Sequence, residues 1–129
     1  MRICLDTNAY SALAKGNEAV AAIVEEADEV IVPATVIGEL TFGFLKGTRF
    51  AQNESELKRF LEEPGVSLKP VTHEIAERYG YIKAELKKKG TPIPENDIWI
   101  AAVALETGAR LISYDTDFDS VGGLVRIAP

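Results

Sequence analysis

The chain opens on the stretch ICLDTN at residues 3–8, in which a short apolar run ends at the acidic residue Asp6. A second run of this kind, RLISY at residues 110–114, ends at Asp115. Between the two runs, short apolar strand-like segments alternate with segments of helical periodicity. Short strands that are apolar on both faces and alternate with helices indicate a parallel sheet covered on both sides. We therefore expect an α/β three-layer sandwich with a short, mainly parallel central sheet flanked by helices.

A chain of 129 residues, 47% of them hydrophobic, is the size of one compact unit with its own core, so we expect a single domain over residues 1–129. The expected strands are 2–5, 29–32, 66–69, 110–114 and 124–127. The expected helices are 7–15, 17–27, 34–46, 54–62, 72–89 and 95–107. Helix 95–107 is apolar almost all round, which is typical of a covered central helix.

Asp6 and Asp115 stand at the carboxyl ends of strands. In parallel sheets the functional site lies beyond those ends, where the strand order reverses. If the two strands are neighbours, the two carboxylates face each other across that crevice. Glu39 interrupts an otherwise apolar helical stretch and Asp97 stands at the head of helix 95–107, so both need only project from flanking helices.

Acidic side chains in such apolar surroundings are costly unless something compensates them. The usual compensation is a hard divalent cation, Mg²⁺ or Mn²⁺, which takes carboxylate oxygens. A carboxylate cluster that holds such ions is the equipment of metal-dependent phosphodiester hydrolysis. Each residue also has a structural interpretation: Asp6 as a helix cap, and Asp97 as a partner of the helix dipole.

Other classes of site fit less well. Asp115, Asp117 and Asp119 suggest a calcium loop, but that loop wants Gly and Glu where this chain has Ser120 and Arg126. Asp119 is interpreted as a surface turn residue, while Asp117 remains an alternative fourth ligand beside Asp115. The chain has one histidine and no Gly-rich phosphate loop, so paired imidazoles, a His-ligated zinc site and a P-loop are disfavoured.

Composition adds few limits. A single cysteine, Cys4, excludes a disulfide framework and favours a reducing cytoplasm. The longest apolar stretch, residues 98–105, is far short of the roughly 20 residues of a membrane span. The net charge of −6 argues against nucleic acid when taken alone, but the basic residues are clustered and bound metal would neutralise several acids.

Four ordered segments resemble PIN domains, the nuclease fold of VapC-type toxins. They are ICLDTN at 3–8, PATVIGEL at 33–40, IPENDIWIAA at 93–102 and LISYDTDF at 111–118. The resemblance implies a Mg²⁺- or Mn²⁺-dependent endoribonuclease. It also implies the metal ligands Asp6, Glu39, Asp97 and Asp115, supported by hydrogen bonds from Thr7, Asn8 and Ser113.

The same resemblance implies a homodimer and a small antitoxin protein that blocks the site. The alternatives are a PIN nuclease of RNA processing and a catalytically silent PIN binding module. An aspartate phosphatase would need an acid where this chain has Asn8, and a receiver domain would need an acidic pair at its first strand.

Large apolar residues gather in the two helices 34–46 and 54–62 and just between them. They are Phe42, Phe44, Leu45, Phe50, Leu57, Phe60 and Leu61. One interpretation is ordinary packing on the core. The other is a groove for an apolar antitoxin helix, with Lys46 and Arg49 at its rim; these two are also our candidates for RNA contact.

Overall fold

The computed structural model describes residues 1–129 and is built on a five-stranded sheet in the order β3-β2-β1-β4-β5. All neighbouring strands pair in parallel. The strands are β1 (Arg2–Leu5), β2 (Glu29–Pro33), β3 (Val66–Lys69), β4 (Arg110–Ile112) and β5 (Arg126–Ile127). The expectation of a short parallel sheet is confirmed.

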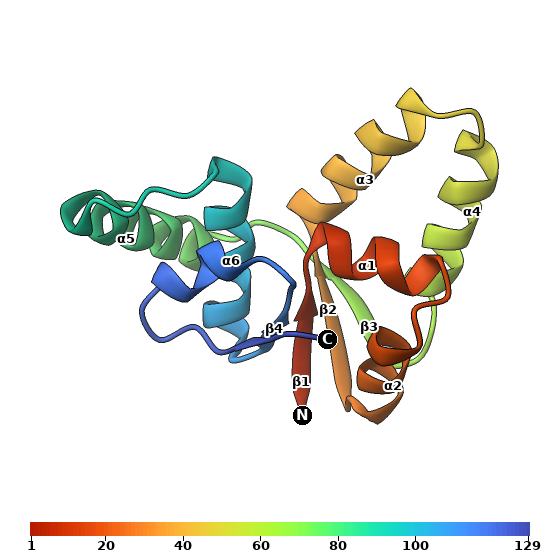
Figure 1. Ribbon diagram of the computed structural model, residues 1–129, viewed down its shortest axis with the longest axis horizontal. Coiled ribbons are helices and arrows are strands. Elements are labelled where there is room, and N and C mark those ends of the chain that lie inside the picture. The colour runs from red at the N-terminus through yellow and green to blue at the C-terminus, as the bar shows by residue number, and fades with distance from the viewer.

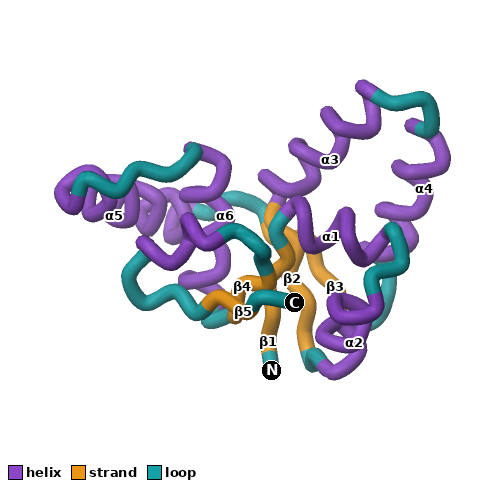
Figure 2. Tube along the Cα trace, viewed as in Figure 1, coloured by secondary structure: helices purple, strands orange, loops and turns teal.

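Helices cover both sides of this sheet. They are α1 (Thr7–Ala14), α2 (Glu18–Glu26), α3 (Ala34–Lys46), α4 (Phe50–Leu61), α5 (His73–Lys89), α6 (Glu95–Thr107) and the short 3₁₀ helix η1 (Thr116–Ser120). In Figure 1, α5 and α6 lie on one side of the strands and α1 and α2 on the other. Figure 2 shows the strands enclosed between these two groups of helices, so the expected three-layer sandwich is confirmed.

The core occupies both faces because successive residues of a strand point to opposite sides. On β1, Cys4 belongs to the larger apolar cluster that includes residues of α5 and α6. Ile3 and Leu5 belong to a smaller cluster, with Ala9 of α1, against which Ile23 of α2 packs. Every strand-derived member of these clusters is at most 4% exposed, so β1 is a central, fully covered strand.

Three boundaries differ from the sequence-based expectation by more than one residue. The helix expected at 54–62 begins at Phe50, because residues 50–53 contain no helix breaker and Asn53 N donates to the carbonyl of Arg49. The strand expected at 110–114 ends at Ile112, where the chain turns into the loop before η1. The last strand is only Arg126–Ile127.

The prediction of an antitoxin groove between α3 and α4 is wrong for the residues of α4 that pack on the core. Leu57 is 4% exposed and belongs to the core, and Phe60 packs on that core and against the ring of Tyr10. Phe42 and Leu45 of α3 are each 63% exposed. The apolar surface is therefore on α3, which extends beyond the sheet in Figure 1, while α4 turns its apolar face inward.

The helices also bear on the membrane question. None of them combines the length and the apolar character that crossing a bilayer requires.

Candidate active site

The strand order reverses between β1 and β4. From β1 the chain builds β2 and β3 on one side, and it then crosses to place β4 and β5 on the other. Leu5 and Ile112 are partners in the register, so Asp6 and Ser113, which follow them, are neighbours at the carboxyl edge of the sheet. The adjacency of strands 2–5 and 110–114, assumed from the sequence, is confirmed.

Asp6 has the role of helix cap that its structural interpretation predicted. It is the N-cap of α1, where its Oδ1 accepts a hydrogen bond from the backbone N–H of Ala9 at 2.8 Å. It is also only 6% exposed. Burial raises the pKa of the Asp6 carboxyl, hydrogen bonds from Ser113 and Ala9 oppose that rise, and the nearby charges of Asp115 and Glu39 add to it.

Glu39 lies on α3, beyond the end of β2. Its Oε1 accepts a hydrogen bond from the hydroxyl of Thr7 at 2.8 Å. Since Thr7 is the first residue of α1, this contact joins the helices that follow β1 and β2. Glu39 is half-buried, as its apolar neighbours in sequence led us to expect.

Asp115 is held by a local turn. Its backbone N–H donates to the hydroxyl of Ser113 at 3.0 Å, and its Oδ1 accepts from the N–H of Asp117 at 2.8 Å as the cap of η1. Ser113 is fully buried and contacts both Asp6 and Asp115, so one hydroxyl lies between these two carboxylates.

Asp119 is an exposed residue of η1, as its interpretation as a surface turn residue predicted, and it also forms an ion pair. Its carboxylate accepts hydrogen bonds from Arg126 at 2.9 and 3.0 Å. Arg126 also donates to the carbonyl of Ser113 at 3.1 Å. Sequence reasoning missed this contact, because it depends on the pairing of β4 with β5.

Asp97 lies in the first turn of α6 and is half-buried. Burial, followed by the charges of Asp115, Glu39, Asp6 and Asp117, raises the pKa of this carboxyl from 3.8 to about 6. Four other acids therefore act on one carboxylate, which places it in the same electrostatic environment as the other three candidates.

These side chains surround one cavity of about 400 Å³ whose lining side chains are all polar or acidic apart from Pro94. Its lining residues are Asp6, Thr7, Asn8, Glu39, Pro94, Glu95, Asn96, Asp97 and Asp115. Asp117 is exposed and does not line it. Glu95 and Asn96 were not among the sequence-based candidates, although they directly precede Asp97.

The structure does not bring Lys46 or Arg49 to this cavity. The ammonium of Lys46 lies 4.7 Å from the centre of the Phe42 ring on α3. Arg49 lines a different hollow together with Tyr10 and Phe44. The two basic residues remain candidates only for contacts at a distance from the carboxylates.

The donor set of the acidic cavity suits a hard divalent cation, because its side chains offer carboxylate, hydroxyl and amide oxygens and no thiol or imidazole. As the side chains stand, no group of three or more His, Cys, Asp or Glu residues is spaced to hold a metal ion. The fit to Mg²⁺ or Mn²⁺ therefore concerns the type of the donor atoms and not their present spacing.

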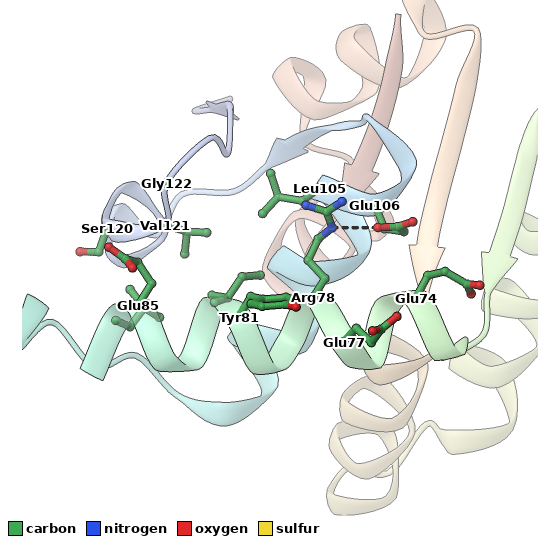
Figure 3. A pocket seen from close by; sticks show the side chains of 12 residues that line it. Glu74, Glu77, Arg78, Tyr81, Glu85, Leu105, Glu106, Ser120, Val121 and Gly122 are labelled. Carbon is green, nitrogen blue, oxygen red and sulfur yellow. Dashed lines mark hydrogen bonds and ion pairs between the residues drawn. The ribbon is translucent and has the colours of Figure 1, made fainter. Parts of the chain in front are cut away.

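A larger hollow, of about 600 Å³, lies elsewhere. Figure 3 shows it along α5, beside the end of α6 and the segment after η1. Its apolar members include Ile82, Leu86 and Val121, and an ion pair of 2.8 Å between Arg78 and Glu106 crosses it. It contains none of the four acidic candidates.

Comparison with known proteins agrees with the geometry. The family profile described as PIN domain matches residues 3–124. Ribonuclease VapC2 of Haemophilus influenzae is 32% identical over 115 residues, which are 88% of this chain and 86% of that protein.

Two solved structures share the fold. The VapBC2 structure of Rickettsia felis, bound to a DNA fragment from its promoter, matches with a TM-score of 0.87 at 26% identity, over 98% of each chain. VapBC-1 of nontypeable Haemophilus influenzae matches with a TM-score of 0.87 at 28% identity, over 98% of this chain and 97% of that one. The chain therefore belongs to the PIN domain family, in its VapC-type branch of ribonuclease toxins from toxin–antitoxin systems.

Proposed function

We propose that this ribonuclease is metal-dependent and that Asp6, Glu39, Asp97 and Asp115 hold its Mg²⁺ or Mn²⁺. The supporting observation is the mostly polar cavity into which four elements of the fold each contribute one carboxylate. A bound ion of this kind supplies an activated water and offsets negative charge on the scissile phosphate and the leaving oxygen. Such hydrolysis leaves a 5′-phosphate and a 3′-hydroxyl.

The protein's own residues prepare the carboxylates for that task. Asp6 cannot turn away, because the Ala9 N–H and the Ser113 hydroxyl both hold its carboxylate. Thr7 fixes Glu39 by its hydroxyl, and the turn at Ser113 fixes Asp115. Asn8 is exposed at the mouth of the cavity, where its amide can reach substrate or a bound water.

The proposed substrate is RNA, and the proposed inhibitor is a small cognate antitoxin. The relatives from Rickettsia felis and Haemophilus influenzae were solved as VapBC structures, and a neighbour from Klebsiella pneumoniae as a toxin–antitoxin complex. We propose that the apolar antitoxin helix packs on the exposed Phe42 and Leu45 of α3, and that the active protein is a homodimer.

The test is cleavage of a mixed RNA pool by the purified chain with Mn²⁺, with Mg²⁺ and with EDTA. We expect cleavage with either ion, none in EDTA, and none with Asp97→Asn, since that change removes one ligand charge at constant size. Mapping of the cut ends should show a 5′-phosphate. Cleavage that persists in EDTA, or full activity of Asp97→Asn, would contradict the proposed mechanism.

A further inference from the structure

The first turn of α6 carries Asp97 but has no side-chain cap of its own. Its N-cap residue is Pro94, which makes no capping hydrogen bond. In this α6 resembles α3 and α4, whereas α1, α2 and α5 are capped by the side chains of Asp6, Asn17 and Thr72. From Ile98 onward α6 is anchored by buried apolar side chains. The turn before Ile98, which carries Asp97, has neither a side-chain cap nor a buried apolar side chain, so its other contacts matter for where Asp97 stands.

Residues of α5 contact the first turn of α6 through an ion pair, hydrogen bonds and a stacked ring. Lys83 forms an ion pair with Glu95 through Oε1, and the hydroxyl of Tyr79 donates to Oε2 of the same carboxylate. Lys83 also donates to the Tyr79 hydroxyl at 3.4 Å. The Tyr79 ring stacks on the indole of Trp99, with centroids 4.0 Å apart and planes 13° apart. We call these four residues the α5–α6 clasp.

Helical geometry relates the clasp to the active site. Tyr79 and Lys83 are four residues apart on α5, and Glu95 and Trp99 are four residues apart on α6, so each pair forms a row on one face of its helix. Asp97 is two positions from either end of the α6 row, about 200° round the helix. When the row faces α5, Asp97 is turned the other way, toward the acidic cavity that it lines.

We propose that Lys83 is a positioning residue of the active site: it holds Glu95 and thereby fixes the first turn of α6, which presents Asp97 to the cavity. The inference rests on the proposed function, since it takes Asp97 as a metal ligand. Lys83 also has a second effect. Glu95 lines the same cavity, and while Lys83 and Tyr79 occupy both of its oxygens it does not act as a fifth free carboxylate.

The test replaces the ammonium and measures metal binding apart from catalysis. Lys83→Met removes the charge and keeps most of the side-chain volume, and Lys83→Arg keeps a donor to Glu95. Supporting residues of metal sites typically change metal affinity by roughly 10- to 100-fold. We expect Lys83→Met to weaken Mn²⁺ binding by about tenfold or more, and Lys83→Arg to keep most of the wild-type affinity. The affinity is measured from the melting temperature as a function of Mn²⁺ concentration.

Trp99 gives a second readout, because it is the only tryptophan of the chain. In Lys83→Met we expect its emission maximum to move to longer wavelength as the stack with Tyr79 loosens. Tyr79→Phe, which keeps the ring and removes the hydroxyl, should keep the emission and lose part of the metal affinity. The matched control is Lys87→Met, one turn further along α5, an exposed lysine that should change neither quantity.

The outcomes separate the two proposals. If the wild type neither binds Mn²⁺ nor cleaves RNA, both the proposed function and the proposed role of Lys83 are overturned. If the wild type does both and Lys83→Met binds Mn²⁺ equally well, only the clasp is overturned. A rise in KM for RNA with unchanged Mn²⁺ affinity would also overturn it, since Lys83 would then contact the substrate directly.

Discussion

At the scale of single residues, the pKa of Asp97 makes the stability of the metal-free protein depend on pH. Its folded-state pKa of about 6 is above the ordinary 3.8, so between these values the folded state binds more protons than the unfolded state. Stability from this group is therefore lost as pH rises through that window. Above it, the ionised carboxylate opposes folding, because it is half-buried among other acids.

We therefore expect Asp97→Asn to be more stable than the wild type at about pH 7.5 in EDTA, and this advantage to shrink at about pH 5. Urea unfolding of both proteins at the two pH values measures the difference. Because the two proteins differ only at position 97, the comparison reports the charge of Asp97 together with its effect on the acids around it. An advantage that is constant with pH, or absent at the higher pH, would show that burial and the neighbouring acids do not raise its pKa.

The fourth ligand can be decided by a second pair of substitutions. Asp115→Asn keeps an oxygen that can accept from the Asp117 N–H, so the turn before η1 should survive. We expect it to lower cleavage on the order of 100-fold, as the loss of one group that stabilises charge typically does. Asp117→Asn should cost less than about tenfold, because Asp117 is exposed and outside the cavity. Single-turnover cleavage rates measure both. A loss for Asp117→Asn as large as that for Asp115→Asn would contradict the assignment of Asp115 as the fourth ligand in place of Asp117.

At the scale of helices and strands, α3 and α4 show that large apolar residues on two neighbouring helices can differ in burial. Leu57 is buried in the core, and replacing it by Asp would bury a charge without a partner. We expect Leu57→Asp to destabilise the fold by about 3 kcal/mol or more. Phe42→Asp should leave the melting temperature and RNA cleavage nearly unchanged, since Phe42 is 63% exposed.

The antitoxin proposal adds a binding prediction for Phe42. Phe42→Asp should cleave RNA in the presence of an amount of cognate antitoxin that silences the wild type. Tyr81→Asp is the matched control, because Tyr81 is 76% exposed but lies on α5, where it lines the hollow of about 600 Å³. It should stay inhibited. If Phe42→Asp is inhibited as strongly as the wild type, the antitoxin does not use this face of α3.

How far the sequence alone could lead differs between these elements. Strand ends are readable, because an apolar run that stops at an acid indicates both the strand and the edge where Asp6 lies. The inward face of α4 was not readable: Leu57 and Phe42 are both large apolar residues on helices, and only the packing of α4 on the core distinguishes them. The clasp on Glu95 likewise depends on how α5 lies against α6.

At the scale of the whole molecule, metal binding should stabilise the fold by mass action. A ligand that binds only the folded state at about 100 times its Kd raises the free energy of unfolding by about 2.7 kcal/mol. In a chain of this size that corresponds to a rise of roughly 10 °C in melting temperature. Relief of the repulsion among the four carboxylates contributes to the affinity for the ion, so it acts by lowering the Kd.

We therefore expect Mn²⁺ to raise the melting temperature of the wild type, and the triple variant Asp6→Asn, Glu39→Gln, Asp97→Asn not to respond. The variant should still fold, since Asn at position 6 can cap α1 as Asp does. The matched control removes the same charge from the hollow along α5, by Glu74→Gln, Glu77→Gln and Glu85→Gln. That control should respond to Mn²⁺ like the wild type. If instead the site variant keeps the response and the control loses it, the ion binds along α5, and the acidic cavity at the switch of strand order is not the metal centre.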